Sequence, residues 1–295
     1  MTAVQGTAGR PAQLVTDEPL RQLTTGYLFT EGPSWHPHEQ SLTFTDIPAG
    51  RIFRLDAAGD VTVVRDPSNK ANGTAYDRQG RLVVCEHATS RLVRRELDGS
   101  WTTLADRYDG RELNSPNDVI VASDGTIYFT DPPYGRTSEF VGVLREVPLD
   151  VCGVYRLVPD TGELTLLIDD LDGPNGLCLS LDESVLYVND TEHGNIRRFR
   201  LQDGRGTGGE VFAVTSGPGD PVVDGLKIDS TGNVYCTGPG GIHVYSPDGA
   251  HVGVIEVPEV VGNFVWGGED LCTLYICAST SVYSVRTTVA GLAAF

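Results

Sequence analysis

Basic residues are scarce in this sequence of 295 residues. Only 22 Lys and Arg stand against 40 Asp and Glu, which gives a formal net charge of −18. Phosphate binding needs a basic face, so we expect no nucleic-acid partner. No apolar run approaches the ~20 residues that a membrane helix requires, so we expect no membrane partner either. Residues 1–19 lack an apolar segment after a basic start, and we therefore expect no secretory signal and a cytoplasmic protein.

Several catalytic motifs are also missing. No Cys-x-x-Cys pair occurs among the six cysteines, which disfavours a zinc site built on thiolates. There is no Gly-x-Ser-x-Gly nucleophile elbow, no phosphate loop and no Gly-rich dinucleotide motif between a strand and a helix. These absences disfavour a serine hydrolase and a nucleotide-dependent enzyme.

Turn-forming residues, by contrast, are abundant, with 35 Gly and 17 Pro between short runs of β-branched and aromatic residues. A unit of about four such strands recurs, and its copies open on Glu31, Asn72, Asn117, Asn175, Asp224 and, more weakly, Asn263. The intervals are 41, 45, 58, 49 and 39 residues. Such a period is typical of propeller blades. The sequence therefore predicts an all-β fold, a six-bladed β-propeller with four-stranded antiparallel blades.

We expect a single propeller domain over residues 1–295. Residues 1–13 are predicted to form a flexible N-terminal tail, and the segment from about Leu14 to Leu28 to supply the outer strand that closes the ring against the last unit. The 58-residue interval indicates an insertion. We predict a lid-like segment over residues 134–150, which is also the one place where a helix is expected.

The repeat also predicts where polar side chains gather. The first strand of a propeller blade is innermost, so the six residues that open the repeats should converge at one end of the central channel. The second strands return to that end and should add an outer ring of Asp46, Glu86 with His87, Asp131 and Asp190. Carboxylate and amide oxygens suit Ca²⁺, with Mg²⁺, Mn²⁺ or Zn²⁺ as alternatives. The competing explanation is that Asn, Asp and Gly recur at strand starts because they form good turns.

Five motifs occur in order at blade spacing. They are Glu31-Gly32-Pro33 with Trp35, Ser115-Pro116-Asn117-Asp118, Phe129-Thr130-Asp131-Pro132-Pro133-Tyr134-Gly135, Gly173-Pro174-Asn175-Gly176 and Asp224-Gly225. Together they resemble the SMP-30/gluconolactonase/luciferin-regenerating-enzyme-like family of six-bladed propellers, from about Leu20 to Val285. In the animal branch a basic residue stands where this chain has Ser115, so the likeness is to the bacterial gluconolactonase branch.

The resemblance implies one catalytic divalent metal, usually calcium, and hydrolysis of a sugar lactone or, in some relatives, of an organophosphate. By position it makes Glu31, Asn117, Asn175 and Asp224 the metal ligands. It makes Asn72 and Asn263 pocket lining. Asp224 is also the family's usual candidate for general base or nucleophile, and that role competes with metal binding for the same lone pairs.

The remaining site predictions concern substrate. His87 is a candidate catalytic residue that would orient water or bind a substrate hydroxyl. Asn72, Asn117, Asp131, Tyr134 and Arg136 are candidate substrate-binding residues, the last two overhanging the pocket from the insertion. A mouth rich in carboxylates repels anions, so the expected small-molecule partner is a neutral sugar lactone.

Two other functions stay open at this point. The same scaffold could serve phosphotriester hydrolysis or a ring-forming or isomerising step of secondary metabolism, because a fold does not dictate a function. A non-catalytic propeller that binds a protein on one face is the third reading. It has no need for the four-oxygen set of Glu31, Asn117, Asn175 and Asp224.

Overall fold

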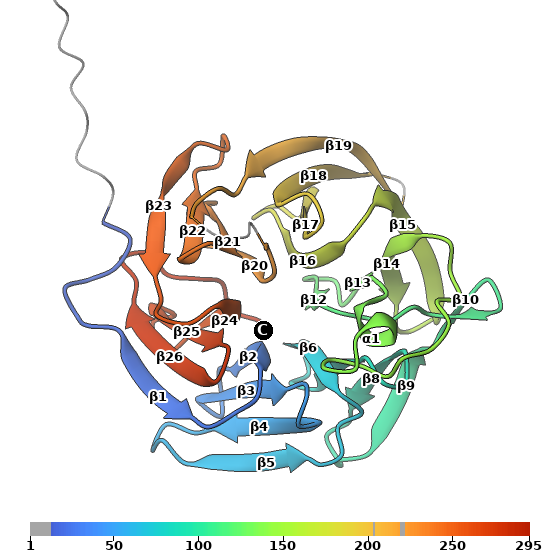
Figure 1. Cartoon of the computed structure of the whole chain (residues 1–295), viewed down its shortest axis with the longest axis horizontal. Coiled ribbons are helices and arrows are strands. Elements are labelled where there is room, and N and C mark those ends of the chain that lie inside the picture. Colours follow the sequence, from blue (N-terminus) through green and yellow to red (C-terminus); the bar gives the residue numbers. More distant parts are fainter. Residues whose placement is uncertain (1–12, 203, 219–221) are drawn as a thin grey trace, which may run out of the picture.

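Each predicted repeat folds into a four-stranded antiparallel sheet, and six such sheets stand in a ring around a central channel (Figure 1). The computed structural model describes residues 13–202, 204–218 and 222–295. The predicted tail, residues 1–13, thus falls outside the described residues except for Gln13. The six-bladed, all-β architecture is confirmed.

The first three blades follow the chain from inside to outside. Blade 1 consists of β2 (Thr30–His36), β3 (Ser41–Asp46), β4 (Arg51–Leu55) and β5 (Val61–Arg65). Blade 2 consists of β6 (Ala71–Tyr76), β7 (Leu82–Glu86), β8 (Arg91–Arg95) and β9 (Trp101–Ala105). Blade 3 consists of β12 (Val119–Val121), β13 (Ile127–Asp131), β14 (Cys152–Val158) and β15 (Glu163–Leu171).

The last three blades repeat the pattern, with one exception at the ring's seam. Blade 4 consists of β16 (Pro174–Leu179), β17 (Val185–Asp190), β18 (Asn195–Gln202) and β19 (Arg205–Val214). Blade 5 consists of β20 (Leu226–Ile228), β21 (Val234–Gly238), β22 (Gly241–Tyr245) and β23 (His251–Glu256). Blade 6 combines β24 (Val261–Gly267), β25 (Thr273–Ala278) and β26 (Ser281–Arg286) with β1 (Arg21–Thr25) from the start of the chain.

The ring closes as the sequence predicted. Strand β1 pairs antiparallel with β26, so that Arg21 lies opposite Ser284 and Thr25 opposite Ser281. An additional bridge joins Val15 to Thr287. Because the outer strand of the last blade comes from the N-terminal side, backbone hydrogen bonds fasten the two ends of the ring.

Apolar side chains fill the spaces between neighbouring blades. One cluster combines Val83 and Cys85 of blade 2 with Phe129 and Tyr155 of blade 3, and the two aromatic rings stack at 5.3 Å. Such interfaces bury the alternate residues of each strand, which explains the period-two pattern in the sequence. All six cysteines are free thiols.

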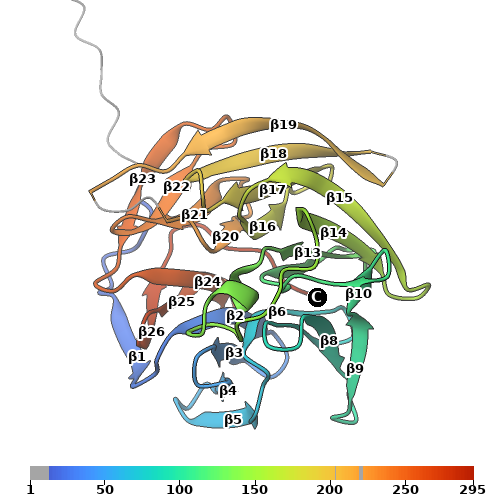
Figure 2. The same ribbon diagram turned by 45° about the vertical axis from the view of Figure 1, so that its right-hand side comes forward.

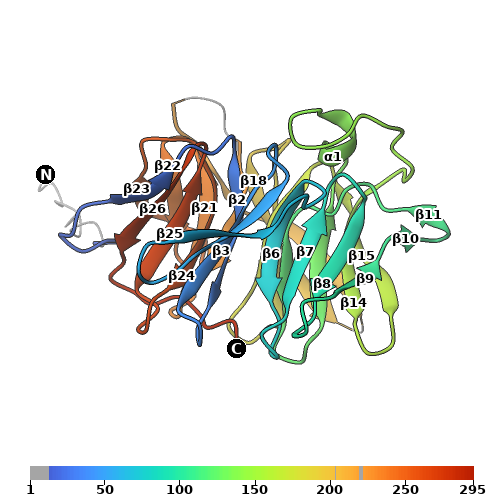
Figure 3. The same ribbon diagram turned by 90° about the horizontal axis from the view of Figure 1, so that it is seen from below.

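Two short pieces leave the blades. Strands β10 (Arg107–Tyr108) and β11 (Arg111–Glu112) form a small ribbon on the outside of the ring (Figure 1). The insertion carries α1 (Tyr134–Thr137), the one helix in the part of the chain that the structure describes. Figures 2 and 3 show α1 and its loop at one end of the channel. No helix among the described residues is long and apolar enough to cross a membrane.

The opposite end of the channel is partly covered by the last residues of the chain (Figure 3). Leu292, Ala293 and Ala294 line an apolar cavity of about 250 Å³ there, and Phe295 packs against the ring of His36 at 5.2 Å. The polar mouth beneath α1 and this apolar end therefore have different chemical character.

Glycines in the inner strands let neighbouring blades approach each other closely. A Cβ added at Gly176 would lie 2.1 Å from the carbonyl oxygen of Asp224 in the next blade, and one at Gly73 would lie 2.5 Å from that of Asn117. At both positions the glycine N–H donates to that same carbonyl, at 3.0 Å and 2.8 Å. A larger residue would separate the blades, which explains why an Asn-Gly pair opens both repeats.

We predict that Gly176→Ala destabilises the protein by about 3 kcal/mol or more, because the methyl group meets rigid backbone and not a movable side chain. The matched control is Gly59→Ala, where a Cβ meets nothing within 4 Å and only the left-handed backbone conformation costs about 1 kcal/mol. Denaturant unfolding measures both changes. Equal losses would show that close approach of the blades is not what Gly176 provides.

Candidate functional site at the channel mouth

The residues that open the six repeats lie at the mouth beneath α1, as predicted. Glu31, Asn72, Asn175 and Asn263 begin or nearly begin the innermost strands of their blades, whereas Asn117 and Asp224 stand just before β12 and β20. Five of the six are buried, and Asp224 is half-buried. The ring geometry thus brings together residues that lie 39 to 58 positions apart in the chain.

Three oxygens of this group are buried without any hydrogen-bond donor. They are Oε1 of Glu31, Oδ1 of Asn72 and Oδ1 of Asn175. The other polar atom of each side chain is engaged: Oε2 of Glu31 accepts from the N–H of Gly32, Nδ2 of Asn72 contacts His87 and Nδ2 of Asn175 donates to Thr191. Buried acceptors without donors are costly. A cation or a hydrogen-bonding ligand would satisfy them.

The donor set has the composition of a hard-metal site. Among the described residues no group of three or more His, Cys, Asp or Glu side chains is arranged to hold a metal ion. The mouth instead combines two carboxylates, Glu31 and Asp224, with amide oxygens. Such mixed oxygen sets fit Ca²⁺ better than zinc, which prefers imidazole and thiolate.

Burial and mutual repulsion perturb the two carboxylates. Burial is the main reason why the pKa of Glu31 rises to about 7, and the charge of Asp118 adds to it. Burial likewise raises the pKa of Asp224 well above its ordinary value, and the neighbouring charge of Glu31 adds to that increase. Carboxyls whose pKa values are strongly perturbed by burial and by each other's charge are enriched at functional sites.

An ion pair inside the channel was missed by sequence reasoning. The Nζ atom of Lys227 lies 3.4 Å from Oδ2 of Asp118, and the Asp118 side chain is almost fully buried. The positive charge of Lys227 also favours the ionised forms of Glu31 and Asp224. Three carboxylates and one ammonium leave a formal charge of −2, which matches one divalent cation. The alternation in Leu226-Lys227-Ile228 was the available signal, since a polar residue between two buried apolar ones points toward the channel.

The predicted outer ring of carboxylates has a different role from the one expected. Asp46 accepts from the N–H of Leu28 at 3.0 Å, and Asp190 accepts from that of Asp172 at 3.0 Å. In each case the carboxylate binds the loop that leads into the first strand of its own blade. The carboxylates of Asp46 and Asp190 therefore accept hydrogen bonds from loop backbone N–H groups, and their oxygens are not free ligands at the opening.

Asp131 follows the same pattern. Its Oδ2 accepts from the N–H of Asn114 at 2.8 Å, while Oδ1 is buried without a donor. Burial raises the pKa of Asp131 to about 7. Glu86, at the corresponding place in blade 2, pairs with Arg65 at 2.7 Å. Substrate binding by Asp131 stays a prediction.

His87 is buried at the mouth with both ring nitrogens engaged. Nδ1 lies 3.0 Å from the carbonyl oxygen of Val141, and Nε2 lies 3.2 Å from Nδ2 of Asn72. Burial lowers the pKa of His87 to about 4, and the positive charges of Arg145 and Lys70 act in the same direction. The imidazole is therefore neutral at physiological pH.

The two predicted residues of the insertion lie in different surroundings. The Tyr134 hydroxyl is buried without a geometrically good hydrogen bond, although it lies near Thr191. Its pKa is raised mainly by burial, with smaller contributions from the charges of Glu192 and Asp224. Tyr134 remains a candidate substrate-binding residue.

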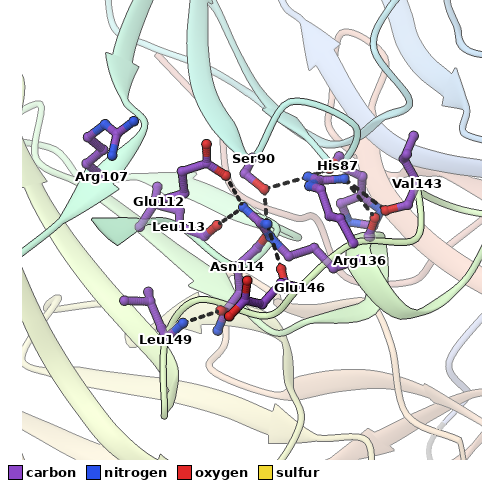
Figure 4. Close-up of polar contacts among 12 residues, drawn as sticks. His87, Ser90, Arg107, Glu112, Leu113, Asn114, Arg136, Val143, Glu146 and Leu149 are labelled. Carbon is purple, nitrogen blue, oxygen red and sulfur yellow. Dashed lines mark hydrogen bonds and ion pairs between the residues drawn. The ribbon is translucent and has the colours of Figure 1, made fainter. Parts of the chain in front are cut away.

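Arg136, in contrast, is committed to the protein (Figure 4). Its guanidinium donates to the carbonyls of Asn114, Leu113 and Glu146 and pairs with Glu112 at 2.7 Å. Substrate binding by Arg136 stays a prediction, but these contacts hold the start of the insertion onto blade 3.

The protein is thus a six-bladed propeller with a mouth lined by carboxylate and amide oxygens. The chain belongs to the SMP-30/Gluconolactonase/LRE-like family, whose model matches residues 29–280. It is 32% identical to a gluconolactonase of Zymomonas mobilis, over 95% of this chain and 84% of that one. It is 29% identical to a pentonolactonase of Haloferax volcanii, over 87% and 83%. The solved structure of a gluconolactonase from Xanthomonas campestris superposes with a TM-score of 0.88 at 35% identity, over 94% and 92%.

The raised carboxyl pKa values predict that the metal-free protein loses stability as the pH rises from about 4.5 through about 7. In the folded chain Glu31, Asp131 and Asp224 keep protons that they lack when unfolded, so unfolding releases protons and becomes easier as pH rises through about 7. The lowered pKa of His87 acts in the opposite sense below pH 6.5. Thermal unfolding in chelator should show a falling midpoint, and a shallower fall in Glu31→Gln. Parallel curves for the two proteins would contradict the assignment to Glu31.

Proposed function

We propose that this protein is a metal-dependent lactonase that opens a neutral sugar lactone to the hydroxy acid. The observation that carries the proposal is the set of three buried oxygens without donors, on Glu31, Asn72 and Asn175. Membership of the family and the names of its lactonase relatives support the reaction class. A cytoplasmic location remains part of the proposal.

Glu31, Asn117, Asn175 and Asp224 would hold the metal, with Ca²⁺ favoured by the carboxylate and amide donors. A divalent cation bound there would polarise the lactone carbonyl and lower the pKa of a bound water. The formal charge of −2 left by Glu31, Asp224, Asp118 and Lys227 supports binding of one such ion.

The chain's own residues position the reactants. Water oxygen forms a bond to the lactone carbonyl carbon, the ring C–O bond breaks, and a proton from the water ends on the ring oxygen as a hydroxyl group. Asp224 is the candidate to take up and return that proton, since its pKa is raised and it lies beside Glu31 and Asn175. The Tyr134 hydroxyl and Oδ1 of Asn72 are free to bind hydroxyl groups of the substrate.

Asp224→Ala should lower kcat/KM for glucono-δ-lactone by about a hundredfold or more and reduce calcium binding in isothermal titration calorimetry. The mutation removes a ligand and the candidate base together. The matched control is Asp248→Ala, an exposed aspartate in the β22–β23 turn of the same blade, which should change neither quantity. Full activity of the wild-type protein after exhaustive chelation would contradict metal dependence.

Substrate charge supplies a second test. One divalent cation offsets Glu31 and Asp224 but not the outer carboxylates such as Asp46 and Asp190, so the mouth favours neutral, hydroxyl-rich ligands over phosphorylated ones. The kcat/KM for glucono-δ-lactone should therefore exceed that for its 6-phosphate by tenfold or more, worth about 1.4 kcal/mol. The opposite preference would mean that the insertion, with its cations Arg136 and Arg145, determines the substrate and the carboxylates do not.

A further inference from the structure

We propose that the insertion fixes the orientation of the Asn72 side-chain amide, so that its oxygen and not its NH₂ group faces the substrate. The carbonyl of Val141 in the insertion sets the tautomer of His87, and His87 in turn orients Asn72. His87 is then a positioning residue that makes the mouth select a substrate hydroxyl at one place. The inference rests on the proposed function and adds a specificity determinant to it.

The first step follows from a backbone carbonyl, which can only accept a hydrogen bond. The carbonyl oxygen of Val141 lies 3.0 Å from Nδ1 of His87, so Nδ1 must carry the proton. Since the imidazole is neutral, Nε2 has no proton and is an acceptor.

The second step is that the unprotonated Nε2 of His87 fixes the orientation of the Asn72 amide. Only the amide NH₂ can donate to an unprotonated Nε2, which lies 3.2 Å from Nδ2 of Asn72. The amide oxygen must then point to the other side. Oδ1 is indeed buried without a donor, and Asn72 as a whole is only 5% exposed. Asn72 can therefore only accept a hydrogen bond, through Oδ1, from a ligand in the mouth.

The insertion holds Val141 in place through contacts on both sides of it. Nζ of Lys70 donates to the carbonyl of Phe140 at 3.0 Å, and Arg145 donates to the carbonyl of His87 at 2.8 Å. A Cβ added at Gly135 would lie 2.7 Å from that of His87, so the insertion packs directly on the histidine. Figure 4 shows His87 and Ser90 beside the insertion, and Arg145 also reaches Ser90 Oγ at 2.6 Å.

An acceptor of fixed orientation discriminates between substrates. A hydroxyl group donates to Oδ1, whereas a lactone without hydroxyl groups leaves the oxygen unsatisfied. If Nε2 of His87 no longer accepted a hydrogen bond from Asn72, the Asn72 amide could rotate and present its NH₂ group to the substrate instead. The loss would then fall on hydroxylated lactones and spare bare ones.

The first experiment reads the histidine directly and does not need activity. Nitrogen-15 NMR of the labelled protein at pH 7 should show the His87 proton on Nδ1 and a bare Nε2. His87→Asn provides the resonance assignment. A proton on Nε2 would overturn the inference whether or not the protein is a lactonase.

The second experiment compares two lactones in His87→Leu. The kcat/KM for glucono-δ-lactone should fall about tenfold, mainly through KM, while that for δ-valerolactone changes less than twofold. His243→Leu is the matched control, since His243 is also buried and bonds a carbonyl, that of Pro239, in blade 5. It should leave both values unchanged.

A double mutant shows whether His87 acts through Asn72. In an Asn72→Ala background, His87→Leu should have no further effect on glucono-δ-lactone. Arg145→Met loosens the insertion and leaves the imidazole of His87 in place. It should shift the ratio of the two kcat/KM values in the same direction, and it serves as the test if His87→Leu does not fold. The inference would be wrong if His87→Leu lowered kcat/KM equally for both lactones, or if it had its full effect in the Asn72→Ala background. An inactive wild-type protein would contradict the proposed function alone.

Discussion

The close approach of each innermost strand to the backbone of the next blade is the constraint on which the rest of the structure depends. Gly73 and Gly176 place their N–H groups on carbonyls of the following blade, where no side chain would fit. Hydroxyl groups of the second strands strengthen the same junctions, as when Thr130 donates to the carbonyl of Asn175 at 2.8 Å. The main chain around the channel is therefore satisfied by the neighbouring blade, and the ring becomes rigid at its centre.

That rigidity lets the protein keep polar atoms unsatisfied in one place. Because the backbones of Asn117, Asn175 and Asp224 are held from the adjacent blade, their side chains cannot relax by shifting the strands. The buried ion pair of Asp118 with Lys227 limits the accumulated charge below them. A preorganised set of oxygens of this kind suits a ligand that must be held in one geometry.

The insertion after β13 adds a layer that the propeller itself does not contain. It reaches from blade 3 across blade 2, where Lys70, His87 and Ser90 receive it. Arg136 anchors its beginning and Arg145 its later part, each by donating hydrogen bonds to backbone carbonyls. In this way the imidazole of His87 connects Val141 of the insertion to Asn72, which opens the repeat of blade 2.

The sequence by itself determined the fold, the number of blades, the closing strand and the six residues at the mouth, because a repeat of similar strands has one arrangement that buries every apolar face. It also located the insertion. The pairing of the polar atoms, in contrast, depends on which groups meet across blades in three dimensions, and no sequence pattern reveals those meetings. The outer carboxylates Asp46 and Asp190 thus bind loop amides, Lys227 meets Asp118 from more than a hundred residues away, and Arg136 turns into the protein. Periodicity predicts on which face a side chain lies, but the partner of a hydrogen bond is set by distances of a few ångströms in three dimensions.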